Sequence, residues 1–137
     1  MKTLADLGGT SWAGQGELWL DPLGNEVEVS KCTLQVVDAG IQYTWVYKDK
    51  EHQGSIELSA AGAQFTDSWH QPESMTCRRL EGRGLFQVEG TYGPDNDWGW
   101  RIGFCMRAPT GEVVLQMTNI APWGEVARAV RIVCSPA

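Results

Sequence analysis

The stretch from Trp98 to Met106, W-G-W-R-I-G-F-C-M, constrains the fold more than any other part of the sequence. Its alternate residues are large and apolar: Trp98, Trp100, Ile102, Phe104 and Met106. The residues between them are small or charged. Because a strand sends successive side chains to opposite faces, this period of two predicts a strand with one buried face. Five bulky side chains on one face require a deep apolar space opposite them.

Weaker versions of the same alternation recur along the chain, separated by turns rich in Gly, Pro, Asp and Asn. The predicted strands span residues 14–20, 26–37, 41–48, 54–60, 65–69, 75–80, 84–92, 98–106, 113–117 and 126–134. Residues 71–74, with the sequence Gln-Pro-Glu-Ser, are predicted to form a loop. Residues 4–9 form either a helical turn or an extended arm.

Nine or ten strands joined by short turns favour an antiparallel meander, in which each strand pairs with its neighbours in sequence. An open meander of this length has two long exposed edges, and closing it into a barrel removes them. The predicted fold class is therefore all-β: a single antiparallel up-and-down β-barrel of nine to ten strands over residues 1–137, with a lead-in segment over residues 1–12. A two-sheet β-sandwich remains the alternative. A barrel of this strand count is wide enough to hold a small ligand.

The composition narrows the cellular setting and the partners. The chain has 137 residues, 42% of them hydrophobic, which is enough for one domain with a substantial core. A net charge of -6 argues against nucleic acid or an anionic membrane as a partner. No apolar run is long enough for a signal peptide or a spanning helix. We therefore expect a cytoplasmic protein whose four scattered cysteines are reduced and half-buried thiols: Cys32, Cys77, Cys105 and Cys134.

Three short motifs carry a resemblance to a known superfamily. Residues 7–16 read L-G-G-T-S-W-A-G-Q-G and follow the pattern L-x-G-x-x-W-x-G-x-G. An F-x-D-x-W pattern spans residues 65–69, and G-W-R spans residues 99–101. Together with the strand meander, these motifs resemble the calycins, which include lipocalins, fatty-acid-binding proteins and avidins, and above all the uncharacterised bacterial calycin-like domains. The resemblance implies a bacterial protein with a lipocalin-like barrel that takes a ligand in its interior.

The chain departs from the familiar calycins at two points. Lipocalins open with G-x-W, whereas Gly9 and Trp12 are one residue further apart. Fatty-acid-binding proteins hold a carboxylate with an Arg-x-Tyr pair in the last strand, and here both Arg128 and Arg131 lack that Tyr. Binding of a fatty acid by that route is therefore not expected. Lipocalins also place an Arg of the last strand across the opening Trp, a position that Arg128 could take.

The aromatic residues on the predicted inner faces define a candidate ligand site. Seven Trp and three Tyr are a heavy load for a chain of this length, and aromatic side chains commonly line ligand cavities. The predicted ligand-binding residues are Tyr43, Trp45, Trp69, Trp100 and Phe104, with Arg128 as the polar anchor. Strand parity places Arg128 on the same face as Val126, Val130 and Ile132. The alternative is that these rings only fill the core.

Asp67 and His70 are further candidate polar groups. Asp67 lies on an apolar face by parity, where a charge requires a partner such as Arg128. His70 lies beside Gln71 and Pro72 at a predicted barrel rim, where a role as a haem or metal ligand is the alternative. His52 lies in a charged turn and is expected to be exposed. Because the histidines and thiols are scattered, we expect no metal site and no cofactor.

No H-E-x-x-H, P-loop or complete G-x-S-x-G motif occurs, so no catalytic residue is predicted. The predicted function is binding of a small apolar or amphipathic molecule inside the barrel. One alternative is an enzyme that uses the same cavity, with Asp67 or His70 transferring a proton. Another is a structural module with a packed, ligand-free barrel that associates, for example as a homodimer.

Overall fold

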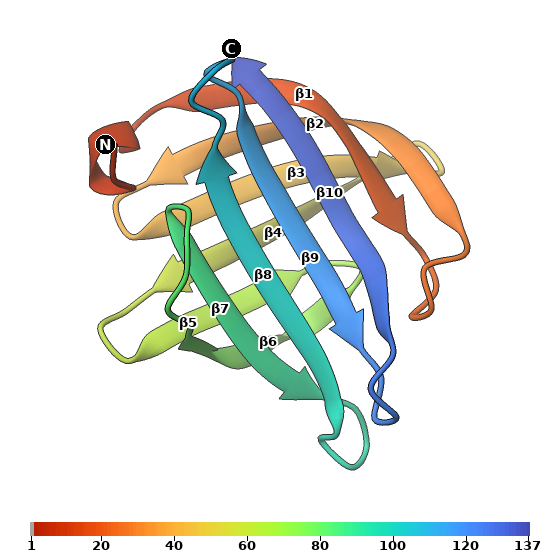
Figure 1. Cartoon of the computed structure of the whole chain (residues 1–137). Helices are drawn as coiled ribbons and strands as arrows, with labels where there is room; N and C mark the ends of the chain where they lie inside the picture. The colour runs from red at the N-terminus through yellow and green to blue at the C-terminus, as the bar shows by residue number, and fades with distance from the viewer. Residues whose placement is uncertain (1) are drawn as a thin grey trace.

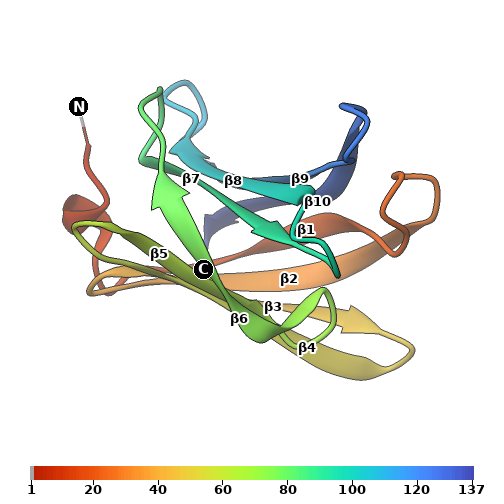
Figure 2. The same ribbon diagram turned by 90° about the horizontal axis from the view of Figure 1, so that it is seen from below.

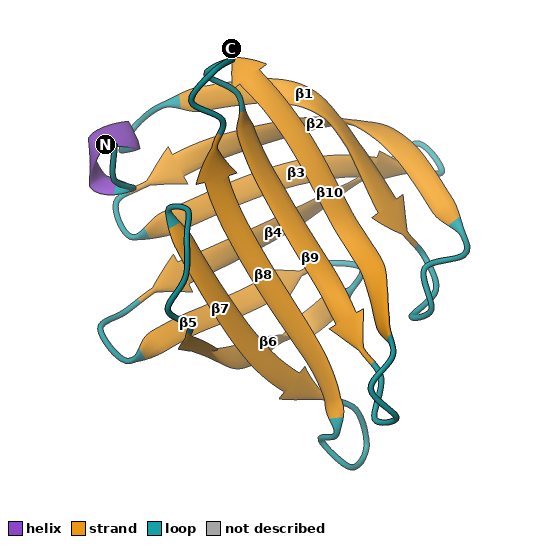
Figure 3. Ribbon diagram, in the orientation of Figure 1, coloured by secondary structure: helices purple, strands orange, loops and turns teal. Residues whose placement is uncertain are grey.

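The alternating apolar residues form ten strands in the computed structural model of the chain, which describes residues 2–137. The strands are β1 (Ser11–Trp19), β2 (Val27–Val37), β3 (Gly40–Tyr47), β4 (Lys50–Leu58), β5 (Gly62–Asp67), β6 (Gln71–Arg79), β7 (Phe86–Tyr92), β8 (Trp98–Met106), β9 (Val113–Ile120) and β10 (Val126–Pro136). A short 3-10 helix, η1 (Ala5–Leu7), precedes them (Figure 3). It settles the open alternative for residues 4–9 in favour of a helical turn.

The sheet closes on itself (Figures 1 and 2). Every strand pairs antiparallel with its neighbours in sequence, and β1 also pairs with β10 over seven residue pairs, from Trp12↔Pro136 to Leu18↔Val130. This last ladder removes the two edges that an open meander would expose. The prediction of an all-β up-and-down barrel is therefore confirmed, and the alternative of a two-sheet sandwich is wrong.

Strand β8 shows why the period of two was informative. Trp100, Ile102 and Phe104 are at most 4% exposed and point into the barrel, whereas Arg101 is exposed on the outer surface. Buried side chains from all ten strands meet the β8 side chains in a single core. The largest fully buried members of that core are Trp45, Tyr43, Phe65 and Phe104. Side chains therefore occupy much of the barrel interior.

The two ends of the barrel differ in chemistry. At one end β1, β3, β5, β7 and β9 finish, and the arrowheads of β1, β7 and β9 point towards it in Figure 1. We call it the aromatic end, because it gathers eight rings, six near the rim and two one step deeper: Trp19, Tyr47, Trp69, Tyr92, Trp98, Trp123, Trp45 and Trp100. At the opposite end η1 lies beside the start of β1, and Leu7 is 3% exposed and packs into the core.

The loop predicted for residues 71–74 is wrong, because these residues belong to β6. The register between β5 and β6 shifts from Phe65↔Met75 to Asp67↔Gln71, so β6 contains extra residues in a bulge. Pro72 falls within the bulge. Residues in a bulge are not paired in the ladder, so the proline, which has no backbone N–H, does not interrupt it. A bulge can therefore hold a proline that would otherwise argue against a strand.

The four cysteines are free thiols, and Cys32, Cys77 and Cys134 are buried. Burial raises the pKa of Cys32 to about 12 and the pKa of Cys77 and Cys134 to about 11. Since the thiolate is the reactive form, we expect 5,5′-dithiobis(2-nitrobenzoate) to modify only the half-exposed Cys105 in the native protein. Absorbance at neutral pH measures this, with denatured protein as the reference for all four. A Cys105→Ser variant should lose the native reaction, and rapid release from two or more native thiols would contradict the prediction.

Candidate functional site

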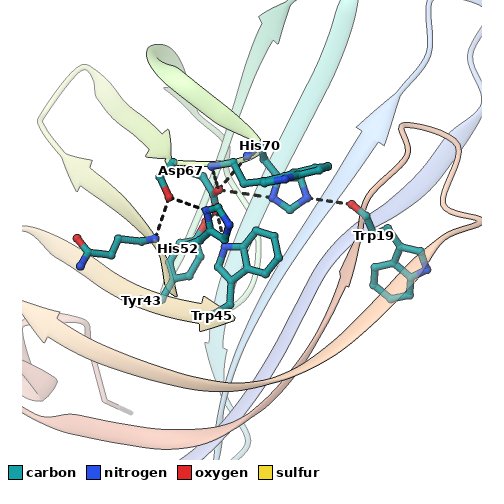
Figure 4. A network of polar contacts seen from close by, with 9 residues as sticks. Trp19, Tyr43, Trp45, His52, Asp67 and His70 are labelled. Atoms are coloured by element: carbon teal, nitrogen blue, oxygen red, sulfur yellow. Dashed lines mark hydrogen bonds and ion pairs between the residues drawn. The ribbon is translucent and has the colours of Figure 1, made fainter. Parts of the chain in front are cut away.

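A buried carboxylate, Asp67 at the end of β5, lies at the centre of the aromatic end (Figure 4). Its side chain has no exposed surface. One carboxylate oxygen, Oδ2, accepts hydrogen bonds from the Tyr43 hydroxyl at 2.5 Å and from Trp45 Nε1 at 3.2 Å. The other, Oδ1, accepts from the backbone N–H groups of Trp69 at 2.8 Å and His70 at 2.9 Å. Four donors thus replace the water that burial removes.

The surroundings of Asp67 stabilise its charged form. Burial raises the pKa of Asp67, but the hydrogen bonding and charge of His70, together with the hydrogen bond from Tyr43, outweigh that effect and hold the pKa below its ordinary value of 3.8. Burial and then the Asp67 charge raise the pKa of Tyr43 well above 10. At neutral pH the pair is therefore a carboxylate with a phenol donor.

His70 links the two sides of the barrel end. Its Nε2 lies 2.9 Å from the backbone carbonyl oxygen of Trp19 at the end of β1. Since a carbonyl can only accept, Nε2 carries a proton and donates it. Its Nδ1 lies 3.6 Å from Asp67 Oδ1, which is within ion-pair distance when the imidazole is protonated. The His70 side chain is only 6% exposed, so both contacts are shielded from water.

Trp100 contributes a buried polar atom without a partner. Its Nε1–H donates a hydrogen bond to no atom of residues 2–137, and its side chain is 4% exposed. The indole lies between Phe65, stacked at a centroid distance of 5.7 Å, and His70, also at 5.7 Å. A buried N–H without an acceptor costs free energy, so such an atom requires an explanation.

An aromatic layer covers this polar group. Trp45 packs against His52 at a centroid distance of 4.8 Å, against His70 at 5.3 Å and against Trp69 at 6.0 Å. Trp69 is half-buried and contacts Tyr47 edge-on at 6.2 Å. Among these rings Trp69 lies in the turn after β5 and therefore forms part of the rim.

The predicted site residues fall into two groups. The structure brings together Tyr43, Trp45, Trp69 and Trp100, with the polar groups Asp67 and His70, at the aromatic end. Phe104 lies elsewhere and packs on Phe86 at the start of β7, near the opposite end. It shares a face with Trp100, but four residues of extended strand separate the two rings by roughly 13 Å.

Arg128 lies outside the barrel, so its predicted position on an inner face is wrong. The register of β10 against β9 shifts between Arg128 and Val130, and Ala129 and Val130 are both buried. This bulge reverses the parity of the strand, because one inserted residue moves all preceding side chains to the other face. Val126 is accordingly 64% exposed, and the Arg128 guanidinium lies over the ring of Trp19, not of Trp12.

His52 is buried at 5% exposure, so the expected solvent exposure is wrong. Strand β4 begins at Lys50, four residues earlier than the predicted start at residue 54, and His52 pairs with Trp45 on an inner face. Its Nδ1 lies 3.1 Å from Ser68 Oγ, which also accepts a hydrogen bond from the backbone N–H of Gln53. Extending the alternation back from the inward-facing Gly54 by two residues predicts that His52 also faces inward.

Other members of the site were not predicted. Asn119 is buried, and its side-chain oxygen accepts a hydrogen bond from the Tyr92 hydroxyl. Trp19 contributes a backbone carbonyl, a group that every residue has, so no sequence signal identifies it. Within the described part of the chain, no group of three or more His, Cys, Asp or Glu side chains could hold a metal ion. No helix of residues 2–137 is both long enough and apolar enough to cross a membrane.

Comparisons with known proteins add no family to this description: no protein-family model matches the chain, and neither curated proteins nor solved structures give a significant match. The function is therefore inferred from the geometry of the site.

Proposed function

We propose that the chain is a calycin-like binding protein that holds a small amphipathic molecule at the aromatic end of its barrel. The observation that carries the proposal is Trp100 Nε1, a buried donor without a partner that is surrounded by aromatic rings. Pockets for small molecules are commonly apolar with a few polar groups that fix orientation. The ligand supplies an acceptor to Trp100 Nε1 and an apolar body to the rings.

The rim determines how the ligand enters. Trp69 is half-buried, whereas Trp45 behind it has no exposed surface. Trp69 lies in the turn between β5 and β6, and its ring contacts the ring of Trp45 edge-on at 6.0 Å. We propose that the Trp69 side chain rotates away from Trp45 to admit the ligand. In this proposal the body of the ligand replaces Trp69 against Tyr47 and Trp45. The site is therefore at the mouth of the barrel, and Phe104 and Arg128 are not part of it.

The wider placement of the protein is part of the same proposal. The closed ten-strand meander and the opening motif support a calycin-like barrel. The free cysteines support a reducing compartment such as the cytoplasm. Bacterial origin depends on the resemblance alone, and the net charge of -6 supports partners other than nucleic acid or an anionic membrane.

The test removes the donor and keeps an aromatic ring. Lauric acid, riboflavin, haemin and indole-3-acetate are titrated separately while Trp fluorescence is followed, and native mass spectrometry of the purified protein detects any retained molecule. We expect at least one probe to bind, and Trp100→Phe to weaken that binding about tenfold, as loss of one buried hydrogen bond does. Trp98→Phe, the same change one step nearer the rim on the same strand, is the matched control.

A packed module without a ligand is the second candidate, and the full burial of Trp45, Tyr43 and Phe65 favours it. The same variants separate the two candidates. If the barrel has no ligand, Trp100→Phe removes only an unpaired N–H, so stability stays equal or rises and no probe binds either protein. That result would refute the binding proposal and leave association between copies as the function to examine.

A further inference from the structure

The outer surface of the barrel has a groove that the proposed function does not use. It crosses β8, β9 and β10 and has a volume of about 350 Å³. Its lining includes Arg101, Arg128 and Arg131 but no acidic residue. The whole chain has 11 Lys and Arg against 17 Asp and Glu, so three arginines around one groove are a local reversal of its charge.

Strand pairing explains how these side chains meet. Thr118 on β9 pairs with Arg101 of β8 on one side and with Arg128 of β10 on the other. In the adjacent outward-facing row, Gln116 of β9 lies between Gly103 and Arg131. Two cross-strand rows of outward-facing residues therefore form the walls of the groove.

The bulge in β10 is what brings Arg128 into this row. Regular alternation would place Arg128 on the same face as the buried Val130, inside the barrel. The register shift turns it outward, where its guanidinium lies 4.7 Å from the centre of the Trp19 ring. Bulges often redirect a side chain at a functional position. Packing on Trp19 also holds the guanidinium in place before any ligand arrives.

The positive charge of the groove is only partly neutralised. Arg101 forms an ion pair with Glu89 at 3.3 Å, but Glu89 also pairs with Arg78 at 3.0 Å. Arg131 lies 3.8 Å from Glu17. Arg128 forms no ion pair with any carboxylate of residues 2–137.

The floor is open because Gly103 has no side chain. A Cβ placed there would have only Gln87 within 4 Å, at 3.9 Å, so the strand tolerates a larger residue at this position. Val126, at 64% exposure, adds apolar surface beside the arginines, whereas Trp19 is 3% exposed and lies beneath the Arg128 guanidinium.

We propose that this groove binds a small organic anion, whose carboxylate or phosphate is held by Arg128 with Arg101 and Arg131 and whose apolar part lies on Val126. The planar guanidinium matches both anions with paired hydrogen bonds. The volume is that of a small-molecule site.

The test uses phenyl phosphate, benzoate and the neutral benzyl alcohol as probes, each titrated into isotope-labelled full-length protein. Amide shifts of Gly103 and Thr118 and the indole shift of Trp19 report on the groove. We expect saturable shifts with at least one anion and none with benzyl alcohol, and the ratio of the two anion affinities identifies the preferred group. Shifts of equal size with benzyl alcohol, or no saturation with either anion, would overturn the proposal.

Variants locate the site. Arg128→Gln should weaken binding of the preferred anion about tenfold, while Arg83→Gln, which removes the same charge from an exposed loop, should not. Gly103→Leu should fill the groove and abolish binding, with the thermal midpoint checked separately. Equal losses for Arg83→Gln and Arg128→Gln would show a general charge effect and refute the site. Trp100→Phe should leave phenyl phosphate binding unchanged, so the groove is tested independently of the aromatic end.

Discussion

Replacing Asp67 by alanine is expected to lower the free energy of unfolding by about 3–5 kcal/mol, because removal of one partner leaves buried polar and charged groups uncompensated. Tyr43 and Trp45 would keep buried donors without an acceptor, and His70 would lose its facing carboxylate. Urea unfolding followed by Trp fluorescence measures the loss. Because the four donors come from the side chains of β3 and the turn after β5, this carboxylate joins separate parts of the barrel end.

Asp67→Asn and Tyr43→Phe are the graded controls. Asparagine keeps the shape of the side chain, but its NH₂ must face either the two backbone donors or the side-chain donors. Asp67→Asn should therefore lower the free energy of unfolding, but by less than Asp67→Ala. Tyr43→Phe removes only the 2.5 Å hydrogen bond and should cost about 1–2 kcal/mol. If alanine at position 67 cost no more than Tyr43→Phe, the network would not have the importance we assign to it.

The same carboxylate gives stability a defined pH dependence. The pKa of Asp67 in the folded protein lies below its ordinary value of 3.8, so the folded state favours the ionised form. The stability gained is fully present above that ordinary pKa and is lost as the pH falls through the folded pKa. Asp67→Asn should therefore have a shallower loss of stability below about pH 4 than the parent protein. Other carboxylates with a lowered pKa, such as that of Glu112, remain in both proteins and cancel in the comparison.

The strands could be predicted because a closed barrel gives nearly every strand one dry face and one wet face. The two errors have different causes. The early start of β4 places His52, which was expected in an exposed turn, on the inner face. The bulge at Arg128 inserts a residue and reverses the expected face. A period of two contains no information about such insertions, and a shift by one residue exchanges inside and outside.

The candidate site was predictable in its residue types but not in its geometry. A charged Asp67 on an apolar face indicated a buried partner, and Tyr43 and Trp45 shared that face. Which partner it finds depends on the stagger of the strands, and the structure supplies Tyr43 and His70 where Arg128 was expected. The distance between Phe104 and the site likewise depends on position along the strand. Alternation shows only which face a residue is on and does not give this distance.

A single methyl group at Gly54 is expected to be about as damaging as the loss of Asp67. Gly54 on β4 pairs directly with Tyr43 on β3, and the tyrosine ring lies over it. A Cβ at this position would lie 2.1 Å from Tyr43 Cζ and 2.3 Å from its hydroxyl oxygen. Tyr43 is 2% exposed and its hydroxyl is held by Asp67, so the ring cannot move aside without breaking that hydrogen bond. We expect Gly54→Ala to lose about 3–5 kcal/mol, from overpacking together with the broken hydrogen bond.

Gly103→Ala is the matched control, because it makes the same change within a strand. A Cβ at position 103 would have its nearest neighbouring atom, in Gln87, 3.9 Å away. It should be neutral or raise stability by about 0.5–1 kcal/mol, since alanine restricts the unfolded chain. In a Tyr43→Leu background, Gly54→Ala should cost far less than it does alone, and this non-additivity is measured by a double-mutant cycle. Equal thermal midpoints for Gly54→Ala and Gly103→Ala would contradict the account. The absence of a side chain at Gly54 thus leaves room for the Tyr43 ring, whose hydroxyl donates its hydrogen bond to Asp67. The polar network at the aromatic end therefore depends on a glycine at this position.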